Sequence, residues 1–306
     1  MTKTFVIRMA DHENHLGING TKRIFSGLFL ATAIFLHLNA SAQEVNLGTA
    51  NNFAVLGASA ISSAGGSASV INGGNVGLYP DGASSITGPI AITPPYTTYA
   101  ADPGGVALKA QNDLTKAYNQ AFGLARTATL TGEVLGTVGT KQDPLTPGVY
   151  FFASSAQLTG TLYLNDEGKT DPIFVFQIGS TLTTASDSAV VELNPGVGTV
   201  EGTSVFWQIG SSATLGTGTD FDGNILAYTS ITDDGDSTVD GRLLAMGGGG
   251  VGGAVTLEDT TINTPPAEVQ VQGPGGSVPD TGSTLLLLGS ALAALIAFER
   301  RFSALA

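Results

Sequence analysis

Residues 206–220 read FWQIGSSATLGTGTD, and residues 175–187 read VFQIGSTLTTASD. The two stretches align as imperfect copies, so that Phe176 falls opposite Trp207. A weaker copy, GNILAYTSITDDGDSTVDGRLLA, follows at residues 223–245. Repeats of this kind indicate stacked supersecondary units, because each unit buries its apolar face on the next one.

Most of the chain between residues 43 and 263 has the pattern of short strands interrupted by Gly, Asn, Asp or Pro. The clearest strands are expected at residues 53–56, 149–152, 173–178, 205–209, 224–228 and 254–257. Residues 106–125 differ, because their apolar side chains recur every three or four positions, as on one face of a helix. The sequence therefore predicts an all-β solenoid, a β-helix, with one long α-helix packed alongside. Asn-Gly at 72–73 and Asp-Gly at 81–82 leave an antiparallel sandwich of hairpins as the alternative.

The N-terminal segment has the pattern of a secretory signal. Lys22 and Arg23 precede an apolar run over residues 24–38, and Ala-Ser-Ala at residues 40–42 fits a cleavage site. We therefore expect residues 1–42 to be removed during export. A buried N-terminal helix is the alternative.

The C-terminal segment, residues 278–306, contains a short motif followed by an apolar run over residues 285–298 and a basic pair. The motif is Val278, Pro279, Asp280, Thr281 and Gly282. The segment resembles the PEP-CTERM type of sorting tail in its VPDSG variant, with threonine in place of the serine. This resemblance implies transient membrane contact, cleavage by a sortase-like enzyme, and a location at the cell surface or in the extracellular matrix. A plain membrane anchor is the alternative, and residues 264–277 have the composition of a linker.

The composition excludes several classes of function. All three histidines precede residue 42 and the chain has no cysteine, so the exported part lacks both residue types. The net charge is −13, and nucleic-acid binding requires clustered Lys and Arg, so no nucleic acid is expected as a partner. A polysaccharide-cleaving enzyme would need a specific carboxylate pair, which no spacing singles out. We expect a monomer that is not an enzyme and uses no cofactor.

Several stretches, taken in order, are similar to the ice-binding-like family. They are VLGASAISSAGGSASVINGGNVGLYP from residue 55, ALKAQNDLTKAYNQAFG from residue 107, LTPGVYFFASSAQLTGTLYL from residue 145, the two repeats, and AVTLEDTTI from residue 254. The resemblance covers about residues 45–263. It implies a right-handed β-helix of triangular section, a long α-helix along one side, and a flat face that binds ice or ordered water.

The resemblance also implies candidate ice-contacting residues. A family motif, Thr-Ala/Gly-x-Thr/Asn, matches residues 184–187, 217–220 and, less well, 235–238. The candidates are Thr159, Thr161, Thr184, Ser186, Thr217, Thr219, Ser237 and Thr238. Threonine suits this role, because its stiff side chain carries a hydroxyl that holds water and a methyl group. Asp187, Asp220 and Asp236 depart from the motif, and a carboxylate is costly to desolvate.

Two other interpretations stay open at this point. The segment DDGDSTVD, residues 233–240, partly resembles an oxygen-rich calcium loop, with Asp233, Asp234 and Asp236 as candidate ligands. It lacks a correctly spaced closing Glu, and solvated turns are the alternative. The second interpretation is a non-catalytic surface adhesin or matrix protein on the same scaffold, without ice activity.

Overall fold

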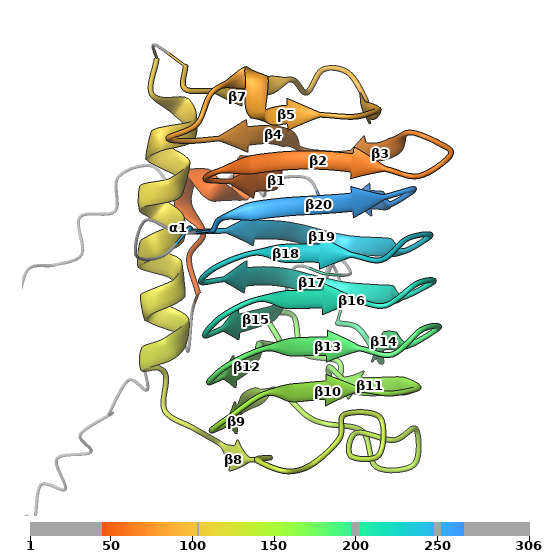
Figure 1. The fold of residues 1–306 in the computed structure, drawn as a ribbon. Coiled ribbons are helices and arrows are strands. Elements are labelled where there is room, and N and C mark those ends of the chain that lie inside the picture. Colours follow the sequence, from red (N-terminus) through yellow and green to blue (C-terminus); the bar gives the residue numbers. More distant parts are fainter. Residues whose placement is uncertain (1–44, 103, 197–201, 203, 248–251, 266–306) are drawn as a thin grey trace, which may run out of the picture. The chain divides into compact units, whose positions relative to one another are not determined.

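The computed structural model describes residues 45–102, 104–196, 202, 204–247 and 252–265. Every strand pairing among these residues is parallel. The strands wind into a stacked solenoid with the helix α1 (Val106–Gly123) along one side (Figure 1). The predicted β-helix with one helix alongside is confirmed, and the alternative of antiparallel hairpins is not found in this part of the chain. No helix of the described residues has the length and apolar character to span a membrane.

The strands belong to two sheets. The seven-stranded sheet has the order β10-β13-β16-β18-β20-β2-β5, and the other strands form a 14-stranded sheet. The strand bounds are β1 Phe53–Gly57, β2 Ala60–Ala64, β3 Ser69–Asn72, β4 Asn75–Leu78, β5 Ile86–Thr87, β6 Ile90–Ile92, β7 Thr98–Ala100, β8 Ala128–Thr129, β9 Gly148–Phe152, β10 Ala156–Leu158, β11 Thr161–Asn165, β12 Phe174–Ile178, β13 Leu182–Thr184, β14 Ala189–Leu193, β15 Val205–Ile209, β16 Ala213–Leu215, β17 Asp220–Ala227, β18 Ile231–Asp233, β19 Thr238–Ala245, β20 Ala254–Glu258 and β21 Thr261–Asn263. Short 3-10 helices cover Gly48–Asn52 and Ala83–Ser85.

Each full turn of the solenoid contributes three strand segments. In one turn β12 and β14 belong to the 14-stranded sheet, and β13 between them belongs to the seven-stranded sheet. β17 and β19 each run without interruption from one turn into the next. They bend at Gly223 and Gly241, both with positive φ, and a β carbon at Gly241 would clash with the carbonyl oxygen of Gly223. Glycine is therefore required where the backbones of two turns touch at this corner.

The first described residues lie in the middle of the stack (Figure 1). β1 pairs with β4 on one side and with β19 on the other, so the first turns rest on the last ones. From β1 the chain proceeds to β7, returns along the whole stack as α1, and builds the remaining turns from β8 to β21 (Figure 1). The seam between β1 and β19 is closed by strand pairing and not by chain connectivity.

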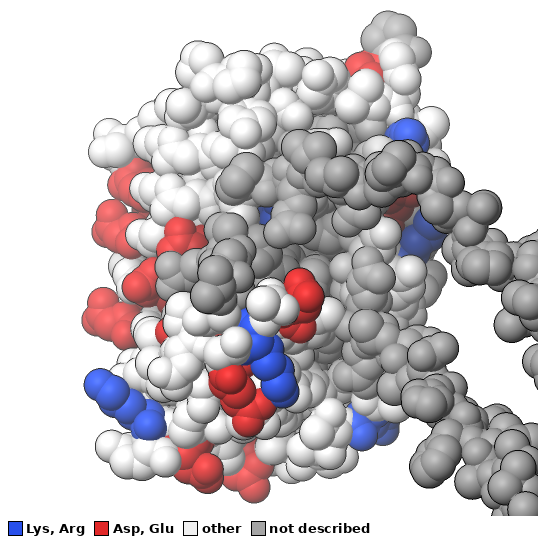
Figure 2. Space-filling model, turned by 180° about the vertical axis from the view of Figure 1, so that it is seen from behind, with Lys and Arg blue, Asp and Glu red and all other residues white. Residues whose placement is uncertain are grey.

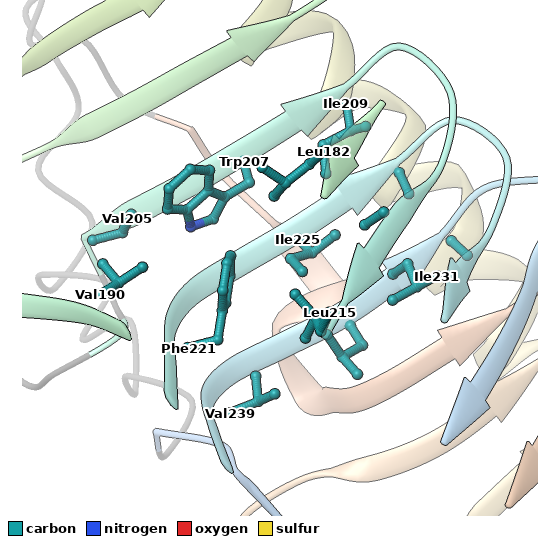
Figure 3. Packing of buried hydrophobic residues seen from close by; sticks show 14 of the residues in the cluster. Leu182, Val190, Val205, Trp207, Ile209, Leu215, Phe221, Ile225, Ile231 and Val239 are labelled. Carbon is teal, nitrogen blue, oxygen red and sulfur yellow. The ribbon is translucent and has the colours of Figure 1, made fainter. Parts of the chain in front are cut away.

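The interior of the solenoid is filled by side chains from successive turns. Phe176 pairs in register with Trp207, as the sequence repeat predicts, and the two rings stack with centroids 4.0 Å apart. The Nε1 of Trp207 donates to the carbonyl oxygen of Asp222 at 3.0 Å. Leu215 and Ile231 point inward from the seven-stranded sheet (Figure 3). Stacked apolar columns of this kind hold the turns in register.

A second buried cluster joins α1 to the outer surface of the 14-stranded sheet, including Leu114 of the helix and Leu226 and Leu244 of the strands. Buried glutamines fasten the helix at two points. The Nε2 of Gln111 donates to the carbonyl oxygens of Gly57 and Ala245 at 2.8 and 3.1 Å, so one side chain spans the seam. The Nε2 of Gln177 donates to the carbonyl oxygens of Ala121 and Phe122 in the last turn of the helix, and of Leu124 just beyond it, at 2.8 to 3.1 Å. The helix consequently ends at Gly123, two residues before the predicted end.

Arg242 ties three distant parts of the chain together at the corner where β19 bends. Its guanidinium donates to the carbonyl oxygens of Asn51 at 3.1 Å and Pro265 at 3.0 Å, and to Oδ1 of Asn224 at 2.9 Å. Arg242 is 2% exposed, and this burial lowers the pKa of its guanidinium to about 10. It joins the segment before β1 to the segment after β21.

We predict that Arg242→Met destabilises the protein by about 2–4 kcal/mol, because three buried acceptors lose a charged donor. Urea unfolding followed by circular dichroism measures the change. Lys141→Met is the control, since this exposed side chain should alter the free energy of unfolding by less than about 0.5 kcal/mol. Equal effects of the two substitutions would contradict the assigned role of Arg242.

Candidate functional site

The outer surface of the seven-stranded sheet carries a column of hydroxyl side chains. In strand order the hydroxyl residues are Thr183, Thr214, Thr232, Thr256, Ser62 and Thr87, and the amide side chain of Gln157 precedes them at one end, each residue in register with the next. From β10 to β2, the residues on either side of each column residue are buried, as Leu182 and Ile231 are. Because side chains alternate along a strand, the column stands on the outer surface, with strands about 4.8 Å apart.

A second column lies two residues earlier along the chain, at or directly before the start of each strand. It is about 6.5–7 Å away along the strand direction. It consists of Ser155, Thr181, Ser212, Ser230, Ala254 and Ala60. Thr181 donates from Oγ1 to Oγ of Ser155 at 2.8 Å. We call these two columns together the hydroxyl face. It contains methyl groups, hydroxyls and the amide of Gln157, but no charged side chain.

The hydroxyl face crosses the seam of the solenoid. Ser62 of β2 donates from Oγ to Oγ1 of Thr256 in β20 at 3.4 Å, although the residues are 194 positions apart in the sequence. β2 and β20 pair over five residues, from Ala60–Ala254 to Ala64–Glu258. The regular surface therefore depends on the docking of the first turns onto the last.

A separate ladder of polar side chains lies inside the corner between the two sheets. Oγ1 of Thr184 and Oγ1 of Thr219 are 2.8 Å apart, and Thr219 also donates to the carbonyl oxygen of Gly216 at 2.5 Å. One turn further on, the buried carboxylate of Asp233 accepts hydrogen bonds from Ser237 at 2.5 Å and from Thr260. The ladder continues from the backbone N of Thr260 to Ser69 and from Ser69 to Ser63, at 3.2 and 2.9 Å. These hydroxyls satisfy buried polar groups where the chain turns from one sheet to the other.

A family model described as Ice-binding-like matches residues 55–263. The chain belongs to this family. A second family model, the VPDSG-CTERM motif, matches residues 277–302. The predicted sorting motif, Val278 to Gly282, is thus confirmed as a sequence motif, although these residues lie outside the described part of the structure.

Relatives in the family cover most of the chain. An ice-binding protein of Nostoc sp. (strain HG1) is 44% identical over 285 residues, which are 90% of this chain and 95% of the relative. An ice-binding protein of Leucosporidium sp. (strain AY30) is 34% identical, with 75% of this chain and 87% of the relative covered. A crystal structure of an ice binding protein from an Antarctic Biological Consortium superposes with a TM-score of 0.61 at 34% identity, covering 72% of this chain and 90% of that one. The ice-binding protein of Antarctomyces psychrotrophicus gives 0.58 at 31%, covering 72% and 98%.

The structure does not bring the eight residues suggested by the family motif onto one surface. Thr184, Thr219 and Ser237 are 3%, 0% and 2% exposed and belong to the internal ladder. Thr161 and Thr238 lie in strands of the 14-stranded sheet, half-buried.

The remaining candidates, Thr159, Ser186 and Thr217, are exposed in the turns between the sheets. The matched segments straddle turns, so some of their residues point into the corner and others into solvent: Thr184 and Thr219 are buried, whereas Thr217 is exposed. The eight residues therefore divide among the corner interior, the turns and the other sheet.

The hydroxyl face instead uses residues that the motif passes over. Thr183 precedes the first motif copy by one position, and Thr232 and Thr256 belong to no copy. The alternation of apolar and hydroxyl residues over Ala213, Thr214 and Leu215 was the available signal, since a period of two indicates one outward side chain. Assigning that alternation to the same face in every turn requires the register between strands.

The predicted calcium ligands also separate. Asp233 is buried and already accepts from two hydroxyls, whereas Asp234 and Asp236 are exposed. Among the residues that the structure describes, no group of three or more acidic or histidine side chains is placed to hold a metal ion. The segment forms a turn around the internal ladder.

We predict a pH-dependent contribution of Asp233 to stability. Burial raises the pKa of this carboxyl group above its usual value. In the unfolded chain the pKa of an aspartate is about 3.9. The contribution of Asp233 to the free energy of unfolding is therefore complete below this pH, and it is lost as the pH rises through the raised pKa of the folded state. The stability of the wild type relative to Asp233→Asn, measured by urea unfolding, should fall as the pH rises above about 3.9. Parallel profiles of the two proteins would refute this assignment.

Proposed function

We propose that this protein binds ice through the hydroxyl face of its seven-stranded sheet. The observation that carries the proposal is the column from Thr183 through Thr214, Thr232 and Thr256 to Ser62, in which each residue is in register with the next. The names of its relatives, as ice-binding proteins, support the same function. The intact column favours ice binding over an adhesin that has lost ice activity.

The physical basis is a rigid grid of weak contacts. Parallel strands repeat the hydroxyl and methyl of threonine about every 4.8 Å, and the two columns are about 6.5–7 Å apart. Threonine loses little side-chain entropy on binding, because its χ1 is already restricted. The buried core fixes the backbone under the face, so many weak contacts with ordered water form together at a low ordering cost. This function requires no catalytic group and no cofactor.

We further propose that the protein acts outside the cytoplasm as a monomer attached to a surface. The predicted signal over residues 1–42 would be removed on export. The sorting tail would make transient membrane contact through residues 285–298, and a sortase-like enzyme would cut within the motif at residues 278–282. The support for this part is the VPDSG-CTERM match at residues 277–302. Attachment would place the hydroxyl face at the cell surface or in the extracellular matrix.

We predict that Thr214→Tyr with Thr232→Tyr lowers thermal hysteresis and inhibition of ice recrystallisation about tenfold or more, because two rings in the centre of the column hold the ice surface away from the rest of it. Both positions are partly exposed, so the fold should persist in circular dichroism spectra.

The matched control is Thr261→Tyr, which adds the same ring to a partly exposed threonine of the 14-stranded sheet. It should retain wild-type ice activity. A folded double variant with unchanged activity would show that the hydroxyl face is not the ice-binding site. A well-folded wild type without ice activity would refute the proposed ice-binding function.

A further inference from the structure

A third column on the seven-stranded sheet carries charge. It lies two residues after the threonine column, beside the turns into the 14-stranded sheet. Its members from β2 to β10 are Ala64, Glu258, Asp234, Gly216, Ala185 and Thr159. Glu258 is in register with Ala64. The backbone N of Asp234 donates to the carbonyl oxygen of Leu215 at 2.8 Å, which continues the backbone pairing of β18 with β16. Since Thr232 pairs with Thr256, Asp234 and Glu258 occupy neighbouring strands.

Both carboxylates face solvent without a cationic partner. Asp234 and Glu258 are exposed. The ion pairs among the described residues are Lys116–Asp113 and Lys169–Glu167, and neither includes these two groups. Acidic side chains follow one edge of the molecule (Figure 2). The charge of the third column is therefore not neutralised within this part of the chain.

The other members of the third column are small. Ala64 and Ala185 have only a methyl group, and Gly216 has no side chain. Ala64 is exposed and Ala185 is partly exposed, whereas Gly216 is buried. Without the two carboxylates the exposed part of this column would be low and uncharged beside the threonines. A carboxylate binds its own hydration shell and is costly to desolvate, so it opposes contact with an ordered water lattice. The two charges lie in the middle of the column and not at one end.

We propose that Asp234 and Glu258 confine the ice contact of this protein to the two columns of the hydroxyl face. This inference rests on the proposed function and specifies the extent of its ligand surface. Ice that approaches the threonine column meets two hydrated carboxylates about 6.5–7 Å further along the strands. Their removal widens the contact by one column and raises ice activity.

The test compares two pairs of isosteric substitutions in the full chain. Asp234→Asn with Glu258→Gln neutralises the third column. Asp187→Asn with Asp236→Asn also removes two negative charges, but from the turns that follow the sheet and not from the third column. Residues 187 and 236 have φ values of 55° and 53°, which asparagine also adopts. The second pair therefore controls for net charge without a backbone penalty.

The expected result is a rise of about twofold or more in thermal hysteresis at equal concentration for the first pair, and no change for the second. Asp234→Ala with Glu258→Ala should raise it at least as much, because alanine matches the small neighbours. Urea unfolding verifies that each variant is folded.

An unchanged or lower hysteresis in the first pair overturns the inference, as does an equal rise in both pairs, which would be an effect of net charge. Failure of the proposed function is distinguishable. It would appear as an inactive wild type, or as full activity in the Thr214→Tyr, Thr232→Tyr variant.

Discussion

Parallel backbone hydrogen bonding between successive turns determines the position of every side chain on this solenoid. Phe176 and Trp207 stack inside because their strands pair in register, and Thr183 and Thr214 align outside for the same reason. A slip by one residue would exchange the inner and outer side chains of a strand, so the apolar interior strongly selects one register. The same backbone pairing between turns therefore produces both the internal stack of rings and the external column of hydroxyls.

The same constraint explains the role of α1. The solenoid is assembled from two lengths of chain, and their junction at β1 and β19 has no covalent link between the adjacent strands. Gln111 bonds to the carbonyl groups of Gly57 and Ala245 on the two sides of this junction, while Arg242 joins Asn51 to Pro265. Because Thr256 and Ser62 meet across the junction, these buried contacts also preserve the continuity of the hydroxyl face.

Polar residues serve two different purposes at the corner between the sheets. Hydroxyls that point inward, such as Thr219 and Ser237, satisfy buried backbone and carboxyl groups. Hydroxyls that point outward from the strands, such as Thr214, remain available to water. The acidic residues of the corner divide in the same way, since Asp233 belongs to the interior and Asp234 to the surface. Adjacent residues of one type can thus have opposite roles.

Local patterns in the sequence determined the strands, the single helix and the stacking of the repeats. These features depend on periodicity and on turn-forming residues that lie within a few positions of one another, so the strand at Val205–Ile209 and the helix from Val106 could be predicted. Local patterns did not determine which residues form the candidate site. Whether Thr184 faces water or Thr183 does depends on how the strand joins its turn and on which strand lies beside it. The tertiary structure alone decided that Ser62 would complete a column with Thr256, because pairing across 194 residues is set by the docking of the two halves of the solenoid.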